Sequence, residues 1–170
     1  MIALVALVCA APFIAAWVTY YFIKPTPGKS YGELLETRPL APLTLHSADA
    51  VKWNGKWRLV MLVADGCATE CRDALYATRQ ARTMLGRERE RLIRVFVTPR
   101  GLEQPVIVEN PDLMVITTSA TLPESWRVAL DRGILLVDPL GNQVMLWPRN
   151  PDIKKLNQDL SRLLRASRIG

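Results

Sequence analysis

Two cysteines four positions apart carry the clearest chemical signal in the chain. Cys67 and Cys71 follow the apolar run Leu59–Ala64 and a short turn that begins at Asp65. A strand that ends in a turn and opens into a helix places both thiols near a helix N-terminus, whose partial positive charge favours thiolates. The carboxylates of Asp65 and Glu70 act in the opposite direction. Thiol chemistry is therefore expected here, and the order of the two thiol pKa values stays open.

The spacing of the two cysteines indicates which reactions they could support. Residues four apart share one face of a helix, so both sulfurs should point the same way, with Cα atoms about 6 Å apart and within reach of a disulfide. Such a pair exchanges disulfides with a partner and offers two soft ligands to Cu(I). Cys67, nearer the start of the helix, is expected to be the attacking thiol. A permanent disulfide, or two buried thiols, is the structural alternative.

The first 23 residues predict a membrane anchor. No charged residue occurs from Met1 to Ile23, and a helix of that length spans about 34 Å, enough for a hydrocarbon core of about 30 Å. Aromatic residues gather near its C-terminal end and Lys24 follows, as expected for an interfacial belt followed by water. A cleaved signal peptide is the alternative.

The rest of the chain is expected to form a tether and one domain. Prolines recur through residues 24–42, which predicts a tether, and residues 43–170 are long enough for a single core. The net charge of +6 lies entirely beyond the anchor, and it suits anionic lipid headgroups or an acidic protein face. Nucleic acid is not expected, because arginine alternates with glutamate in Arg87–Arg91.

The order of the expected elements predicts the fold. A helix between the first two strands makes a βα unit with a parallel crossover, and the turn at Asp138–Asn142 makes the last two strands a hairpin. A short helix is expected over Pro123–Asp131, and a closing helix is expected to start at Asn150 as cap with Pro151 as its first residue. This order is typical of a thioredoxin-like α/β domain, a mixed central sheet with flanking helices, here behind one transmembrane helix. Strands are expected over Arg58–Ala64, Ile93–Thr98, Leu113–Thr117, Ile134–Val137 and Gln143–Trp147.

The sequence resembles the Sco/SenC group, membrane-tethered thioredoxin-fold proteins that help deliver copper to cytochrome c oxidase. The resemblance rests on a Cys-x-x-x-Cys motif after a strand, the later segment Ile134–Gly141 and the N-terminal anchor. The chain is also similar to a membrane protein encoded with bacterial cytochrome oxidase assembly genes. That similarity rests on Tyr31–Leu34, Gly55–Trp57, the pair Cys67 and Cys71, and Leu163–Ser167.

Two departures from this group concern the site. Sco proteins carry a histidine copper ligand shortly before the strand that leads into the Asp-Pro-x-Gly turn, where this chain reads Ala129–Ile134 without a histidine. The single histidine, His46, is expected to be a surface or hydrogen-bonded residue. A thioether from Met61, Met114 or Met145 could serve as a third ligand, although strand methionines are usually core residues. The cis-proline typical of thioredoxin-fold oxidoreductases is also missing, since Gly133 and Ile134 occupy its region.

The resemblance implies a thiol-redox or copper-handling factor that assists cytochrome c oxidase assembly, with Cys67 and Cys71 as redox residues and as Cu(I) ligands. Cytochrome c oxidase or its assembly factors would be the partners, and membrane lipid would hold the anchor. The domain is expected on the periplasmic side of a bacterial inner membrane, where thiol pairs are oxidised. A general thiol–disulfide oxidoreductase and a non-catalytic scaffold remain as alternatives, so whether the protein is an enzyme stays open.

Overall fold

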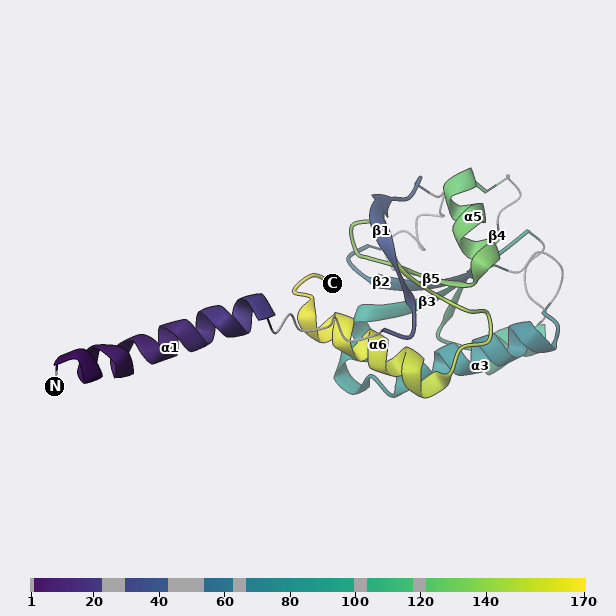
Figure 1. Ribbon diagram of the computed structural model, residues 1–170. Helices are drawn as coiled ribbons and strands as arrows, with labels where there is room; N and C mark the ends of the chain where they lie inside the picture. The colour runs from purple at the N-terminus through teal and green to yellow at the C-terminus, as the bar shows by residue number, and fades with distance from the viewer. Residues whose placement is uncertain (1, 23–29, 43–53, 63–66, 100–103, 118–121) are drawn as a thin grey trace.

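The computed structural model describes residues 2–22, 30–42, 54–62, 67–99, 104–117 and 122–170. Helix α1 (Ile2–Phe22) lies outside the layers formed by the other elements (Figure 1), and its side chains are described from Cys9 to Tyr21. No helix within the described residues is both long and apolar enough to cross a membrane. The predictions that concern His46 and Asp65 lie outside the described residues.

The remaining chain forms a six-stranded mixed sheet in the order β1-β6-β5-β2-β3-β4. The pairs β2–β3 and β3–β4 are parallel, and the other three pairs are antiparallel. The predicted strands and the hairpin are therefore confirmed, and the fold is thioredoxin-like. The strands are β1 (Glu33–Pro39), β2 (Trp57–Leu62), β3 (Leu92–Thr98), β4 (Leu113–Thr117), β5 (Ile134–Val137) and β6 (Asn142–Trp147).

Helices cover both faces of this sheet, because its central strands are apolar on both sides. Helices α3 (Thr69–Thr83) and α6 (Ile153–Ala166) lie on one face and α5 (Glu124–Arg132) on the other (Figure 1). Successive side chains of β2 lie on opposite faces of the sheet. Leu59 packs into the cluster beneath α3 and α6, and Val60 packs into the cluster beneath α5. A 3-10 helix, η1 (Gly86–Arg91), and a short helix, α4 (Gln104–Glu109), complete the domain.

Three features differ from the sequence-based expectation. Residues 33–39, which the proline pattern assigns to the tether, form the edge strand β1. This strand is almost wholly exposed, so it has no apolar alternation to predict it, and its backbone pairing with β6 holds it in place. The closing helix begins later than Asn150, because the Asp152 carboxylate accepts a 2.9 Å bond from the Lys155 N–H and acts as the cap. Helix α4 was not predicted.

Candidate functional site

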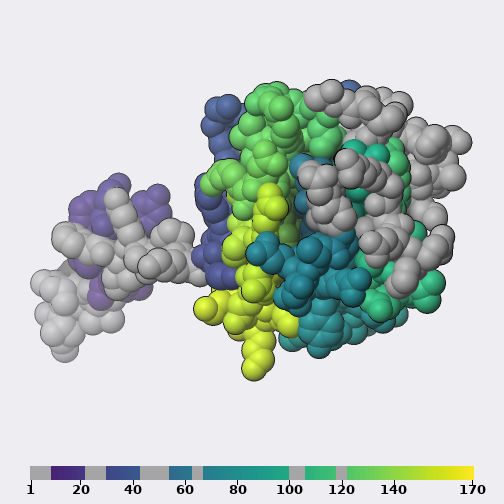
Figure 2. All heavy atoms as spheres, turned by 90° about the vertical axis from the view of Figure 1, so that its right-hand side faces the viewer, coloured from purple at the N-terminus to yellow at the C-terminus, as the bar shows by residue number. Residues whose placement is uncertain are grey.

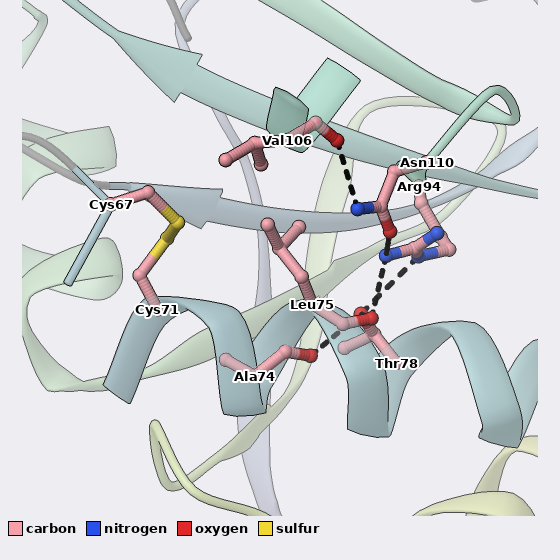
Figure 3. The surroundings of a disulfide bond; sticks show 8 residues. All are labelled: Cys67, Cys71, Ala74, Leu75, Thr78, Arg94, Val106 and Asn110. Carbon is pink, nitrogen blue, oxygen red and sulfur yellow. Dashed lines mark hydrogen bonds between the residues drawn. A yellow bond between two sulfur atoms is a disulfide. The ribbon is translucent and has the colours of Figure 1, made fainter. Parts of the chain in front are cut away.

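Cys67 and Cys71 form a disulfide at the start of α3 (Figure 3). Their Cα atoms lie 5.2 Å apart, in agreement with the spacing argument. Cys67 is 8% exposed and belongs to the core cluster beneath α3, whereas Cys71 is half-buried at the edge of that cluster. The bridge is therefore built into the wall of the core, and its more accessible residue is Cys71.

The two cysteines hold different positions relative to the helix. Ala68 is the N-cap of α3 and makes no side-chain capping bond, so Cys67 precedes the helix and Cys71 is its third residue. The N–H groups of the first turn lack intrahelical acceptors and carry the positive end of the helix dipole. Cys71 thus lies within the turn that favours a thiolate. Glu70 in the same turn opposes that effect.

A buried arginine lies farther along the same helix. Arg94 on β3 is fully buried, and its guanidinium donates to the Leu75 carbonyl at 2.7 Å and to the Thr78 hydroxyl at 3.2 Å. It also donates to the Asn110 side-chain oxygen at 3.1 Å and pairs with Asp112 at 3.0 Å. Figure 3 shows Leu75 between the disulfide and this network. Arg94 therefore ties the disulfide-bearing helix to the chain that joins α4 to β4.

Burial lowers the pKa of Arg94 from its ordinary value, and the negative charge of Asp112 opposes that shift. Arg94 was not predicted as a functional residue from the sequence, although the sequence contains a signal for it. Arg94 is the one charged residue in the otherwise apolar strand β3, and a charge inside a buried strand requires partners.

The three methionines considered as a third ligand lie in the two core clusters. Met61 and Met145 are buried in the core cluster that contains Cys67, and Met114 is half-buried in the cluster on the opposite face. Within the described ranges, no group of three or more His, Cys, Asp or Glu side chains could hold a metal ion. Cys67 and Cys71 are therefore the pair of soft donors that the structure brings into direct contact.

Within the Ala129–Ile134 stretch that lacks a histidine, the backbone leaves no room for a side chain at Gly133. A Cβ atom added at Gly133 would collide with the Trp147 carbonyl at the end of β6. No residue other than glycine fits between α5 and β5 at this point unless β6 moves. The described residues also contain no cis peptide bond, in agreement with the missing cis-proline.

The family of the chain follows from its match over residues 57–167. This chain belongs to the family described as the transmembrane-like, thioredoxin-like, C-terminal domain. The matched segment begins at β2 and ends just after α6, so it contains both cysteines and Arg94. No curated protein sequence matches the chain.

Several solved structures share the fold. The solution structure of apo Sco1 from Thermus thermophilus has a TM-score of 0.56 at 19% identity and covers 81% of this chain and 96% of its own. Arabidopsis thaliana ScoI with copper bound has a TM-score of 0.54 at 19% identity, covering 69% and 88%. Yeast Sco1 with copper bound has a TM-score of 0.51 at 16% identity, covering 82% and 91%. At these identities the similarity establishes the fold.

Proposed function

We propose that this protein is a membrane-anchored thiol-redox and copper-handling factor that assists cytochrome c oxidase assembly. The observation that carries the proposal is a disulfide between Cys67 and Cys71, four positions apart, where the central strand β2 leads into α3. Similarity to Sco structures, two of them with copper bound, supports copper as the cargo.

The redox step is a thiol–disulfide exchange with a partner protein. The oxidised pair reacts with a partner dithiol, and the reduced pair reacts with a partner disulfide. A partner thiolate attacks one sulfur of the bridge, forms a mixed disulfide and releases the other cysteine as a thiolate. The second partner thiol then attacks the mixed disulfide. The partner becomes a disulfide, and Cys67 and Cys71 gain two electrons and two protons between them. The reverse sequence reduces a partner disulfide and re-forms the bridge between Cys67 and Cys71.

Once reduced, the two cysteines offer Cu(I) the soft sulfur ligands that it prefers. Lacking a histidine in the Ala129–Ile134 stretch, the pair should bind Cu(I) more weakly than a three-ligand site. It should scarcely bind Cu(II), which requires nitrogen or oxygen donors.

The anchor is the charge-free stretch Met1–Ile23, within which α1 forms. Exposed aromatic side chains at Trp17, Tyr20 and Tyr21 suit a membrane interface. We place the domain in the periplasm of a bacterial inner membrane. A reporter fused after Gly170 should be active there, and activity confined to the cytoplasm would refute this topology.

The test of the site is a titration of the full chain in detergent, in a Cys9→Ser background that removes the third thiol. The reduced protein should compete with a Cu(I) chelator for about one ion, and Cys67 and Cys71 should show one reversible two-electron midpoint potential. Cys67→Ser and Cys71→Ser should each abolish both properties. Normal oxidase maturation in cells that carry the double variant under low copper would refute the proposal.

A second candidate is thiol–disulfide exchange on protein partners without copper. It is favoured by the formed bridge, and by the finding that no His, Asp or Glu side chain within the described ranges joins the two cysteines in a metal-binding group. A reversible midpoint potential with no Cu(I) retention would select it. The absence of both properties would instead leave a scaffold that reuses the fold.

A further inference from the structure

The exposed face of α6 and the residues just after it carries charge of a single sign. The acidic residue inside this stretch, Asp159, is 4% exposed and faces the core, where its carboxylate accepts bonds from Gly32 N at 2.8 Å and Trp147 Nε1 at 3.1 Å. The exposed charged side chains from position 154 to position 168 are all basic: Lys154, Lys155, Arg162, Arg165 and Arg168.

Helix stability does not account for this pattern. The positive end of a helix dipole favours acidic side chains in the first turn, and its negative end favours basic side chains in the last turn. Arg165 in the last turn fits this rule, but Lys154 and Lys155 lie in the first turn, directly after the Asp152 cap. Their placement costs helix stability, so the basic face requires a different explanation.

The same face contains a shallow hollow with the chemistry of a phosphate site. Arg162 and Arg165 line it together with Ser161, Gln158 and Asn157, whose amide also donates to the Ala81 carbonyl at 2.9 Å. Guanidinium groups bind phosphate oxygens through paired, charge-assisted hydrogen bonds, and amides and hydroxyls add neutral donors.

Helix α6 is also the element that holds the chain as it arrives from the N-terminal helix. The Asp152 N–H at the start of α6 donates to the Tyr31 hydroxyl at 3.1 Å, and the Lys155 amine lies 5.4 Å from the centre of the Tyr31 ring. From Ile23 to Tyr31 the backbone can span at most about 29 Å. With the reach of the Tyr31 side chain added, the start of α6 therefore stays within about 40 Å of the end of the anchor.

We infer that the exposed face of α6 docks on an anionic membrane surface and binds lipid phosphate groups in the hollow beside Arg162 and Arg165. The inference rests on the membrane anchor of the proposed function. Figure 1 shows the C-terminal end of α6 and the disulfide-bearing start of α3 at opposite ends of the domain, and Figure 2 shows α6 on the outer surface. The C-terminal part of the docking face, with Arg162 and Arg165, therefore lies at the other end of the domain from the disulfide.

The experiment measures how fast a membrane-impermeant amine reagent labels Lys154 and Lys155 in the full chain, reconstituted into vesicles. One set of vesicles contains phosphatidylcholine only and the other contains phosphatidylglycerol as well. The lysine introduced by Arg127→Lys, on the exposed side of α5, serves as an unprotected reference. A basic residue near an anionic surface raises the docked population about fivefold, so labelling of Lys154 and Lys155 should fall at least fivefold in anionic vesicles. Labelling should recover in 0.5 M NaCl, which screens the attraction.

The charge-reversal variant Arg162→Glu/Arg165→Glu should lose this protection, while Arg38→Glu/Arg72→Glu, with the same change in charge on exposed positions of β1 and α3, should keep it. Equal labelling in the two vesicle types would overturn the inference. Protection by 10 mM inorganic phosphate in neutral vesicles would also overturn it, in favour of a site for free anions. An alkaline carbonate wash tests the anchor separately. If the protein stays with the vesicles while Lys154 and Lys155 are labelled at the same rate in both, the docking of α6 is refuted and the anchor is not.

Discussion

The disulfide and the Arg94 network contact the same helix, but they join residues that are separated by very different lengths of chain. The disulfide joins residues four positions apart. Arg94 binds partners 16 to 19 positions away, and Asp159 reaches Gly32 across 127 positions. A cross-link stabilises mainly by restricting the unfolded chain, and a loop as short as that of the disulfide contributes about 2 kcal/mol, against about 4.7 kcal/mol for a loop of 100 residues.

This difference indicates a division of labour. The polar networks join distant segments and should hold the fold, whereas the disulfide adds little and can open without unfolding the domain. A redox-active disulfide should open without unfolding the domain, whereas a structural disulfide should not.

The largest effect is expected from Arg94→Met. The variant leaves the Leu75 carbonyl and the Asn110 side-chain oxygen without this donor and takes the counterion from Asp112, so the free energy of unfolding should fall by about 3 to 4 kcal/mol. Chemical denaturation of the full chain in detergent measures it. The exposed control Arg127→Met should change stability by less than about 0.5 kcal/mol. Equal effects of the two variants would contradict a structural role for the network.

A somewhat smaller loss is expected from Asp159→Ala. The change leaves Trp147 Nε1 and Gly32 N buried without their acceptor, at a cost of about 2 to 3 kcal/mol. Near-ultraviolet circular dichroism should report the altered surroundings of Trp147. Unchanged stability would show that water replaces the carboxylate.

Reduction of the disulfide should cost less still. Dithiothreitol should lower the free energy of unfolding by about 2 kcal/mol at most. The Cys67→Ser/Cys71→Ser variant, measured without reductant, should be as stable as the reduced protein. A loss of 4 kcal/mol or more would make the bridge a structural element and would remove the basis of the proposed redox role.

The smallest effect separates the two cysteines from each other. In the reduced state, Cys67→Ser should lower the free energy of unfolding by about 1 kcal/mol more than Cys71→Ser, because it places a hydroxyl in the core cluster. Alkylation by iodoacetamide should be faster for the thiol that remains in Cys67→Ser, because Cys71 is the more exposed and lies in the first helical turn. The opposite order would restore Cys67 as the attacking thiol, as its place in the sequence predicts.

The sequence predicted the elements whose signals are local. The central strands are runs of apolar β-branched and aliphatic residues, and the β5–β6 turn contains its own proline and glycine, with Gly141 at a φ of 95°. Strand β1 was not predicted because six of its seven residues are exposed, so it shows no apolar alternation, and its pairing with β6 is a contact between distant segments. The start of α6 was misplaced by two residues because Asn150 and Asp152 are both good caps, and the hydrogen bond to Lys155 N selects Asp152.

By itself, the sequence determined that two thiols lie within disulfide reach of each other where a strand is followed by a helix, because cysteines four residues apart meet when the chain turns from strand to helix. The prediction that both lie on one face of that helix was wrong for Cys67, which precedes the helix. Tertiary structure decided the rest. It buried Cys67 and left Cys71 accessible, placed Arg94 beneath the helix that carries them, and closed the Gly133 position with the backbone of β6. These outcomes depend on contacts between segments far apart in the chain, and neither residue type nor local spacing encodes which distant groups will meet.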